Sequence, residues 1–212
     1  MRRFIVTGAP GTGKTSILRA LAADGYAVVE EAATDVMAVR LAHGDPEPWT
    51  DPRFIDRITR LQRQRREEPV RPGAAAQLHD RSAVCTLALA RYLGHPVPPL
   101  LAAEADMIRR GGYFDRRVFF VRPIGFLQPT EIRRISYQES LEFERVHEAE
   151  YRRLGFDLVD MPAGTGRHAQ HLMCASIAAA RSATVPAGIS TRSKPRRRYS
   201  ASWTRSNSSD SW

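Results

Sequence analysis

The stretch Gly8-Ala9-Pro10-Gly11-Thr12-Gly13-Lys14-Thr15 decides the fold, because it is a complete P-loop of the pattern G-x-x-x-x-G-K-T. An apolar strand pattern at Phe4–Thr7 precedes it, and an amphipathic helical pattern follows it. Such a loop directs successive backbone N–H groups at a phosphate, and the helix adds the positive end of its dipole. Lys14 can reach the β- and γ-phosphates, and the Thr15 hydroxyl can coordinate Mg²⁺. Together with Ser16, the stretch predicts a binding site for ATP and Mg²⁺.

Strand and helix patterns alternate from residue 3 to residue 160. Short apolar runs predict four further strands, at Tyr26–Val29, Ala74–Leu78, Val118–Val121 and Phe156–Val159. The Ser136-Tyr-Gln-Glu139 stretch is a capping box, which predicts a helix from there to Leu154. Strands that alternate with helices predict an α/β fold with a parallel sheet and helices on both of its faces.

The composition divides the chain into a P-loop ATP-binding domain, residues 1–181, and a tail, residues 182–212. The tail holds six basic residues against Asp210 alone and has almost no aliphatic residues to bury. We expect it to be disordered and dispensable; an alternative is that its basic cluster at Lys194–Arg198 binds nucleic acid or an anionic surface. The tail carries more than half of the net charge of +9, so the charge does not require DNA or RNA as a partner of the domain.

Hydropathy and cysteine usage indicate the compartment. No apolar run in the 212 residues is long enough to span a bilayer, and the N-terminus does not resemble a secretion signal. Cys85 and Cys174 lack the C-x-x-C spacing of metal or redox sites, so we expect reduced thiols. These features predict a cytoplasmic protein without a membrane partner.

An acidic residue follows the predicted third strand, in the stretch His79-Asp80-Arg81-Ser82. Ligands of open α/β sheets bind at the carboxyl ends of the strands, where this stretch lies. Asp80 is expected to organise Mg²⁺ or to accept a proton, and Arg81 to bind a phosphate. The alternative is that Asp80 caps the helix that begins near Ser82.

Two glutamates end the predicted second strand at the same edge of the sheet. We expect Glu30 to be the general base for an acceptor hydroxyl. Side chains alternate along a strand, so we expect Glu31 to face the opposite side. The alternative is that both are surface carboxylates.

Two sets of arginines are candidates for contact with phosphate or acceptor. Arg133 and Arg134, just before the capping box, can neutralise the phosphoryl group during transfer; the alternative is a structural surface pair. The other set lines a predicted helix with an apolar stripe, and it either forms a solvated face or contacts an acceptor or nucleic acid. This second set consists of Arg57, Arg60, Arg63, Arg65 and Arg66.

Taken together, these motifs resemble the NadR-like AAA domain group, small bacterial P-loop ATPases related to nicotinamide riboside and deoxynucleoside kinases. The resemblance covers roughly residues 2–165 and rests on Phe4–Thr15, Val28–Ala32, His79–Ser82, Val118–Val121, Arg133-Arg134 and Asp160–Gly164. It implies a kinase-like P-loop NTPase fold with a five-stranded parallel sheet. It also implies a lid that carries Arg133 and Arg134, and adenine near the Pro162–Gly164 loop.

The sequence thus predicts an ATP- and Mg²⁺-dependent phosphotransferase that acts on a small hydroxyl-bearing, nucleoside-like metabolite. Its expected partners are ATP and this acceptor, and the protein is a monomer or a homodimer. One alternative is a nucleotide-dependent regulatory ATPase without a small-molecule acceptor. A second alternative is a nucleic-acid-binding ATPase, which would bind DNA or RNA with a strong dependence on salt.

Overall fold

A computed structural model of the protein describes residues 1–123, 136–162 and 167–182. Its centre is a five-stranded sheet in the order β2-β3-β1-β4-β5, in which every pair of neighbours is parallel. The strands are β1 Arg3–Thr7, β2 Ala27–Val29, β3 Gln77–Asp80, β4 Arg117–Val121 and β5 Asp157–Met161. The central strand β1 is apolar and buried on both faces, as expected for a parallel strand between two helical layers. The predicted α/β fold is therefore confirmed.

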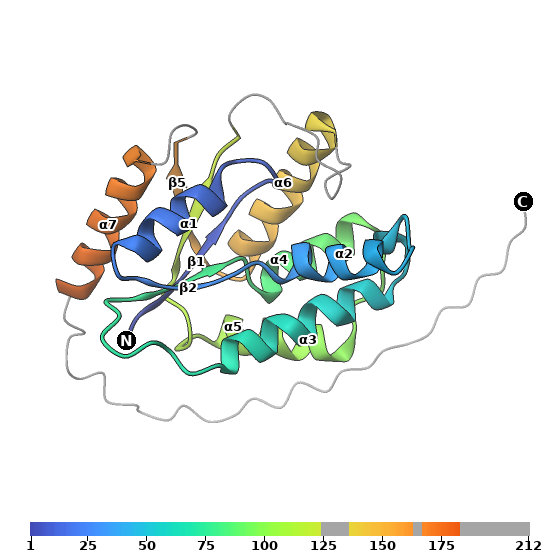
Figure 1. Ribbon diagram of the computed structural model, residues 1–212, viewed down its shortest axis with the longest axis horizontal. Coiled ribbons are helices and arrows are strands. Elements are labelled where there is room, and N and C mark those ends of the chain that lie inside the picture. The colour runs from blue at the N-terminus through green and yellow to red at the C-terminus, as the bar shows by residue number, and fades with distance from the viewer. Residues whose placement is uncertain (124–135, 163–166, 183–212) are drawn as a thin grey trace, which may run out of the picture. The chain divides into compact units, whose positions relative to one another are not determined.

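Helices cover both faces of the sheet (Figure 1). They are α1 Lys14–Ala23, α2 Ala32–Ala42, the 3-10 helix η1 Pro48–Thr50, α3 Arg53–Glu67, α4 Ala83–Tyr92, α5 Pro99–Arg110, α6 Tyr137–Arg153 and α7 Arg167–Ser182. One face carries α1 and α7, which pack on Phe4 and Val6. The other face carries α4, α5 and α6, which pack on Ile5 and Val118. Side chains alternate along β1, so Phe4 and Val6 belong to the core on one face of the sheet and Ile5 to the core on the other.

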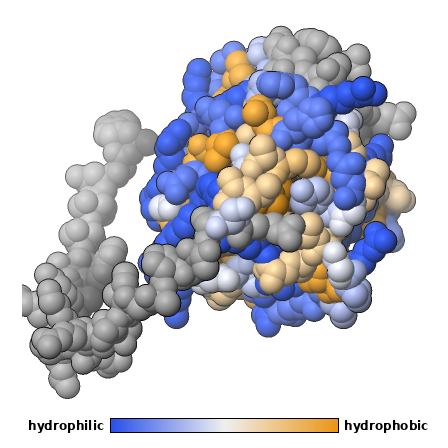
Figure 2. Space-filling view, turned by 90° about the vertical axis from the view of Figure 1, so that its left-hand side faces the viewer, coloured by the Kyte–Doolittle hydropathy of each residue, from blue (hydrophilic) through white to orange (hydrophobic). Residues whose placement is uncertain are grey.

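Helix α7 illustrates how the outer surface is composed. Its inner side buries Met173 and Ile177, whereas Leu172 is 37% exposed. Figure 2 shows the side of the molecule on which α7 lies in Figure 1, where hydrophilic residues surround a patch of more apolar ones. Within the described ranges, no helix combines the length and the apolar character that crossing a membrane requires.

The strand register fixes which residues meet at the carboxyl edge of the sheet. Val6 lies opposite Asp80 on β3, and Thr7 lies opposite Phe120 on β4. The loop that follows Thr7 therefore starts between Asp80 and the end of β4. This is the edge at which open α/β sheets bind ligands.

The third and fifth strands each end two residues later than the sequence-based expectation. The third strand runs from Gln77 to Asp80 instead of Ala74–Leu78, because β1 pairs with it from the Arg3–Gln77 partners onward. Strand β5 continues to Met161, because it pairs with β4 as far as the Val121–Met161 partners. The expected capping box is present: Ser136 accepts from the Glu139 backbone, and the Glu139 side chain accepts from the Ser136 backbone.

Several predicted features lie outside the described residues. These are the lid arginines Arg133 and Arg134, the 163–164 part of the expected adenine loop, and residues 183–212 of the tail. What the sequence predicts for these residues therefore remains a prediction.

Candidate functional site

The P-loop joins β1 to α1 through glycines in conformations that other residues avoid. Gly8 has φ 137° and approaches β4 so closely that a Cβ atom there would lie 2.2 Å from the Val121 carbonyl oxygen. Gly13 has φ 85° and is the N-cap residue of α1. A side chain is excluded at Gly8 and strained at Gly13, so the local sequence dictates this loop.

Lys14 folds back into the loop that precedes it. Its Nζ donates hydrogen bonds to the carbonyl oxygens of Ala9 at 2.7 Å and Gly8 at 3.1 Å. Burial lowers the pKa of Lys14 to about 8, and the nearby Arg81 charge acts in the same direction. Since this value is above neutral pH, the ammonium group remains mostly charged and available to a phosphate.

Arg81 leaves β3 through an unusual backbone turn. Its φ is 71°, and no other non-glycine residue of the described ranges has a positive φ. Its N–H donates to the Val6 carbonyl at 2.9 Å, and its buried guanidinium forms an ion pair with Glu31. Burial disfavours the charged form, but the carboxylates nearby, Glu31 above all, raise the pKa of Arg81 above its usual range. A fixed positive charge therefore lies beside the P-loop.

The structure brings Glu31 into the site instead of Glu30. Glu31 pairs with Arg81 and lines the cavity described below, whereas the Glu30 side chain is exposed and its carbonyl accepts a hydrogen bond from Arg65 at 3.0 Å. Glu30 was expected to face the site and Glu31 the opposite side, but Glu31 is the one that lines the cavity, because β2 ends at Val29 and strand alternation stops there. Glu31 is instead the N-cap position of α2.

Neighbouring groups stabilise the negatively charged form of Glu31. Burial alone would raise its pKa, but the positive charges of Arg81 and Lys14 prevail and lower it. The Thr34 hydroxyl also donates to Glu31 Oε2 at 3.0 Å. Glu31 is therefore a carboxylate at neutral pH.

Asp80 is the last residue of β3 and is buried. Burial, assisted by the Glu31 charge, raises its pKa to about 7 against the opposing effect of Lys14 and Arg81. Its Oδ1 has no hydrogen-bond partner among the described residues. The helix-capping alternative does not apply, because Ser82 caps α4 through a hydrogen bond from the Val84 backbone. Asp80 thus keeps one oxygen for a further partner.

These residues fit a magnesium ion by the chemistry of their donor atoms. Mg²⁺ binds hard oxygen ligands, usually one or two protein groups together with phosphates and water. Thr15 lines the cavity at the P-loop, and the unpartnered oxygen of Asp80 is buried close to Lys14. The donor set that the sequence predicted is therefore present at one edge of the sheet.

The P-loop opens into a cavity of about 1030 Å³. The phosphate end consists of Pro10, Gly11, Gly13, Lys14 and Thr15, with Glu31 and Arg81 beside it. The far end is largely apolar and aromatic, and its walls include Met37, Trp49, Phe54, Leu89, Tyr92, Leu93 and Phe143. Among these walls the Thr86 hydroxyl donates to the Gln62 amide oxygen at 2.8 Å. Sequence reasoning missed these walls, because they come from separate helices and follow no motif.

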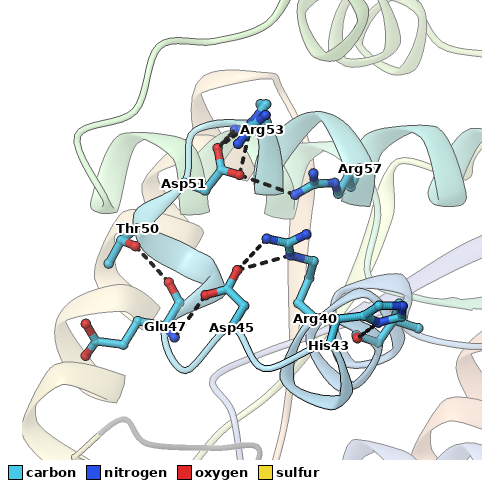
Figure 3. A network of polar contacts seen from close by, with 9 residues as sticks. Arg40, His43, Asp45, Glu47, Thr50, Asp51, Arg53 and Arg57 are labelled. Atoms are coloured by element: carbon cyan, nitrogen blue, oxygen red, sulfur yellow. Dashed lines mark hydrogen bonds and ion pairs between the residues drawn. The ribbon is translucent and has the colours of Figure 1, made fainter.

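A polar network fixes the loop that carries Trp49 (Figure 3). Asp45 accepts hydrogen bonds from Arg40 at the end of α2, and Asp51 accepts from Arg53 and Arg57 on α3. The Trp49 carbonyl contacts His95 Nε2 at 2.7 Å. Contacts to both flanking helices thus hold this wall of the cavity in place.

The arginine-rich helix α3 uses its charges mainly within the molecule. Arg65 pairs with Asp35 of α2, and Arg66 pairs with Glu104 of α5. The other four arginines also have carboxylate partners: Arg53 and Arg57 with Asp51, Arg60 with Asp56, and Arg63 with Glu67. The described contacts therefore give this helix a structural role.

Comparison with known proteins agrees with this architecture. A family model described as an AAA domain matches residues 3–169. The chain is similar to a deoxyadenosine kinase from M. mycoides solved with the products dCMP and a flexible dCDP bound, at 13% identity and a TM-score of 0.51, over 84% of this chain and 99% of that chain. It is also similar to a NadR protein in complex with NR, at 18% identity and a TM-score of 0.56, over 89% of this chain and 53% of that one.

The chain thus spans about half the length of that NadR protein. At these identities the structural likeness establishes the fold alone. The matches confirm the resemblance to a P-loop, kinase-like AAA group. No curated protein sequence matches the chain.

Proposed function

Since this chain belongs to the AAA domain family, we propose that it is an ATP- and Mg²⁺-dependent kinase that transfers the γ-phosphoryl group to a small nucleoside-like metabolite. The observation that carries the proposal is the cavity with two chemically different ends. Its P-loop end offers Lys14, Arg81 and backbone N–H groups to phosphates. Its aromatic end is of the kind that binds a flat ring by stacking.

The acceptor half of the proposal rests on the chemistry of the far walls. Trp49, Tyr92 and Phe143 offer aromatic faces, while Gln62 and Thr86 offer an amide and a hydroxyl for hydrogen bonds. A ring with polar edges, joined to a hydroxyl-bearing sugar, matches such a mixture. The two structural relatives named above are described with dCMP and dCDP, and with NR, respectively. These ligands support a nucleoside-like acceptor.

In the proposed mechanism the protein mainly positions groups and compensates charge. The P-loop N–H groups and Lys14 hold the β- and γ-phosphates, and Arg81 adds positive charge at the same end. Thr15 and Asp80 would hold Mg²⁺, which when bound neutralises charge on the phosphate oxygens. Arg133 and Arg134 are proposed to close over the triphosphate.

Glu31 is the proposed general base for the acceptor hydroxyl. It is a carboxylate, and it lines the cavity between the P-loop and the aromatic end. Asp80 is not among the residues that line this cavity, which favours Glu31 over Asp80 as the base. Glu31 accepts the hydroxyl proton as the oxygen attacks the γ-phosphorus.

The test is ATP consumption by the purified full chain, measured against nucleosides, nicotinamide riboside, sugars and other small alcohols. We expect a large increase over the rate without acceptor for at least one nucleoside-like compound, with phosphorylated product detected by mass spectrometry. If ATP hydrolysis is equal with and without every acceptor, the kinase proposal is wrong and a regulatory ATPase takes its place.

A further inference from the structure

A buried polar cluster that the proposed kinase chemistry does not use surrounds the thiol of Cys85. Its Sγ atom lies 2.6 Å from His147 Nε2, 3.0 Å from Thr7 Oγ1 and 3.5 Å from the Tyr151 hydroxyl. These partners come from α6 and from the end of β1. A cysteine with only a packing role does not need three polar partners, so the cluster indicates a chemical role.

Positively charged groups and a hydrogen-bonding imidazole surround the thiol. Cys85 lies in the first turn of α4, where the backbone N–H groups and the helix dipole stabilise an anion. The Arg81 and Lys14 charges lie close enough to interact with it electrostatically. Burial keeps the pKa of His147 well below its usual range, so the imidazole is neutral and one ring nitrogen can accept the thiol hydrogen. Reactive cysteines have surroundings of this kind.

The thiol is also within reach of small molecules. Cys85 is only 3% exposed, yet it forms part of the wall of the large cavity, close to Arg81. A reagent the size of water or peroxide fits in a cavity of about 1030 Å³ and can approach Cys85 from within it. The cavity and the positive charges beside the thiol therefore favour its reaction with a small electrophile.

We propose that Cys85 is a modification site, a thiol that hydroperoxides oxidise to a sulfenic acid and whose oxidation weakens nucleotide binding in the adjoining cavity. The sulfur attacks one oxygen of the peroxide, an S–O bond forms and the O–O bond breaks. Sulfur loses two electrons and the peroxide gains them. The thiol proton passes through His147 Nε2 to the departing hydroxide, which leaves as water.

The consequence for the cavity follows from the position of the added oxygen. It must fit among Thr7, Arg81 and His147, which are all buried. Thr7 immediately precedes the P-loop, and Arg81 holds Glu31 by an ion pair. The new group therefore disturbs the phosphate end of the cavity. The oxidation step itself does not depend on the kinase proposal.

The chain supplies its own control thiol. Cys174 is half-buried in α7 and packs against the apolar cluster around Phe4 and Val6. It is in the middle of its helix, so it lacks the stabilisation that a helix N-terminus gives. If exposure alone governed reactivity, Cys174 would react faster than Cys85.

The experiment treats the full-length protein with hydrogen peroxide and follows both cysteines by peptide mass spectrometry after trapping sulfenic acid. We expect Cys85 to react at least about tenfold faster than Cys174, because the contact with His147 and the position of Cys85 in the cavity wall outweigh the greater exposure of Cys174. Cys174→Ser should leave the Cys85 rate unchanged. His147→Gln, which keeps a hydrogen-bonding group but cannot relay the proton, should slow Cys85 about tenfold. Peroxide should reduce ATP affinity of the native chain and of Cys174→Ser, but not of Cys85→Ser.

Three results would overturn the proposal. One is a Cys85 rate equal to or below that of Cys174 in the unaltered protein, which needs no variant to fold. Another is an unchanged Cys85 rate in His147→Gln with a native melting temperature. The third is full ATP affinity in protein whose Cys85 is oxidised. A failed acceptor screen would leave each of these measurements intact.

Discussion

Single residues at the phosphate end of the cavity combine opposite charges within a small buried volume. Lys14 and Arg81 supply positive charge, and Glu31 and Asp80 supply carboxyl groups. Only Glu31 and Arg81 form a direct ion pair. Lys14 instead donates to loop carbonyls, and Asp80 keeps an oxygen without a partner. Within the described part of the chain, Lys14 and Asp80 have no ionic partner, and they are the groups assigned to phosphate and metal.

The Lys14→Ala variant tests the phosphate role. We expect ATP affinity to fall by roughly two orders of magnitude, since a charge-assisted hydrogen bond contributes about 1.5–3 kcal/mol. The fold should survive, because Lys14 contacts its own loop and not the apolar core. Calorimetric titration with Mg·ATP measures the first effect and circular dichroism the second. Unchanged affinity in the folded variant would contradict the central assignment.

Glu31→Gln and Glu30→Gln form a matched pair of neighbouring variants. Glu31→Gln should reduce turnover with acceptor by roughly 10²–10⁴-fold, the usual range for loss of a general base. Glu30→Gln should have little effect, because its side chain is exposed. Thermal melting must accompany the kinetics, since the first change also weakens the ion pair with Arg81. The opposite ranking would restore Glu30 as the base.

The raised pKa of Asp80 predicts a defined dependence of stability on pH. In the unfolded chain its pKa is near the ordinary value of 3.8, and in the folded protein it is about 7. The folded state therefore binds more protons between these values, so the Asp80 contribution to the free energy of unfolding falls as pH rises from about 4 to about 7. His79, whose pKa burial lowers to about 3, acts in the opposite direction over much of this window.

The difference between the unaltered protein and Asp80→Asn isolates the Asp80 contribution. Relative to the variant, the unaltered protein should lose stability as pH rises from about 4 to about 7 in urea unfolding without Mg²⁺. A parallel pair of pH profiles would mean that Asp80 is ionised in the folded protein. Mg·ATP should reduce the difference, because a bound cation favours the carboxylate.

At the scale of elements, the contact between the P-loop and β4 sets the geometry of the site. The Gly8 Cα approaches the Val121 carbonyl, which fixes the start of the loop against the sheet. On the other side of β1, the β3 strand ends beside Val6 and delivers Asp80 and Arg81. Strand β4 thus positions the loop, and strand β3 independently positions Asp80 and Arg81.

Gly8→Ala should therefore be strongly destabilising. The added Cβ would lie 2.2 Å from a backbone oxygen and would hold φ at 137°, so strain and overpacking together should cost about 2–5 kcal/mol. Gly44→Ala is the matched control, with φ 81° and no atom within 4 Å of the new Cβ, and strain alone should cost about 1 kcal/mol there. Urea unfolding gives both values. Equal costs would show that β4 yields to the methyl group.

At the scale of the whole molecule, two apolar cores share one sheet. Their largest members include Phe4 and Phe119 on the α1–α7 side and Tyr151 on the α6 side. Residues 1–182 form one compact unit. All the described parts of the candidate site belong to this unit.

Truncation after Ser182 tests the predicted division of the chain. The removed residues are basic and poor in aliphatic side chains, so we expect the melting temperature and the ATP affinity to remain unchanged. Differential scanning calorimetry of both forms is sufficient. A clear fall in melting temperature would mean that the tail packs on the domain. Binding of DNA by the full chain alone would revive the nucleic-acid alternative.

The sequence by itself determined the P-loop, the order of strands and helices and the capping box at Ser136. Each of these depends on neighbouring residues: eight consecutive residues set the loop backbone, and three or four set a helix cap. The position of Asp80 at a strand end followed in the same way. The parallel sheet followed from the alternation of strands and helices, because such crossovers permit few other arrangements.

Only the tertiary structure decided which side chains face the cavity. Glu31 points into it because α2 begins there and ends the alternation of β2, a boundary set by packing. His147 reaches Cys85 across 62 positions of sequence, and the aromatic walls come from several helices. Contacts between distant residues depend on how helices pack against the sheet, and no spacing along the chain encodes that geometry.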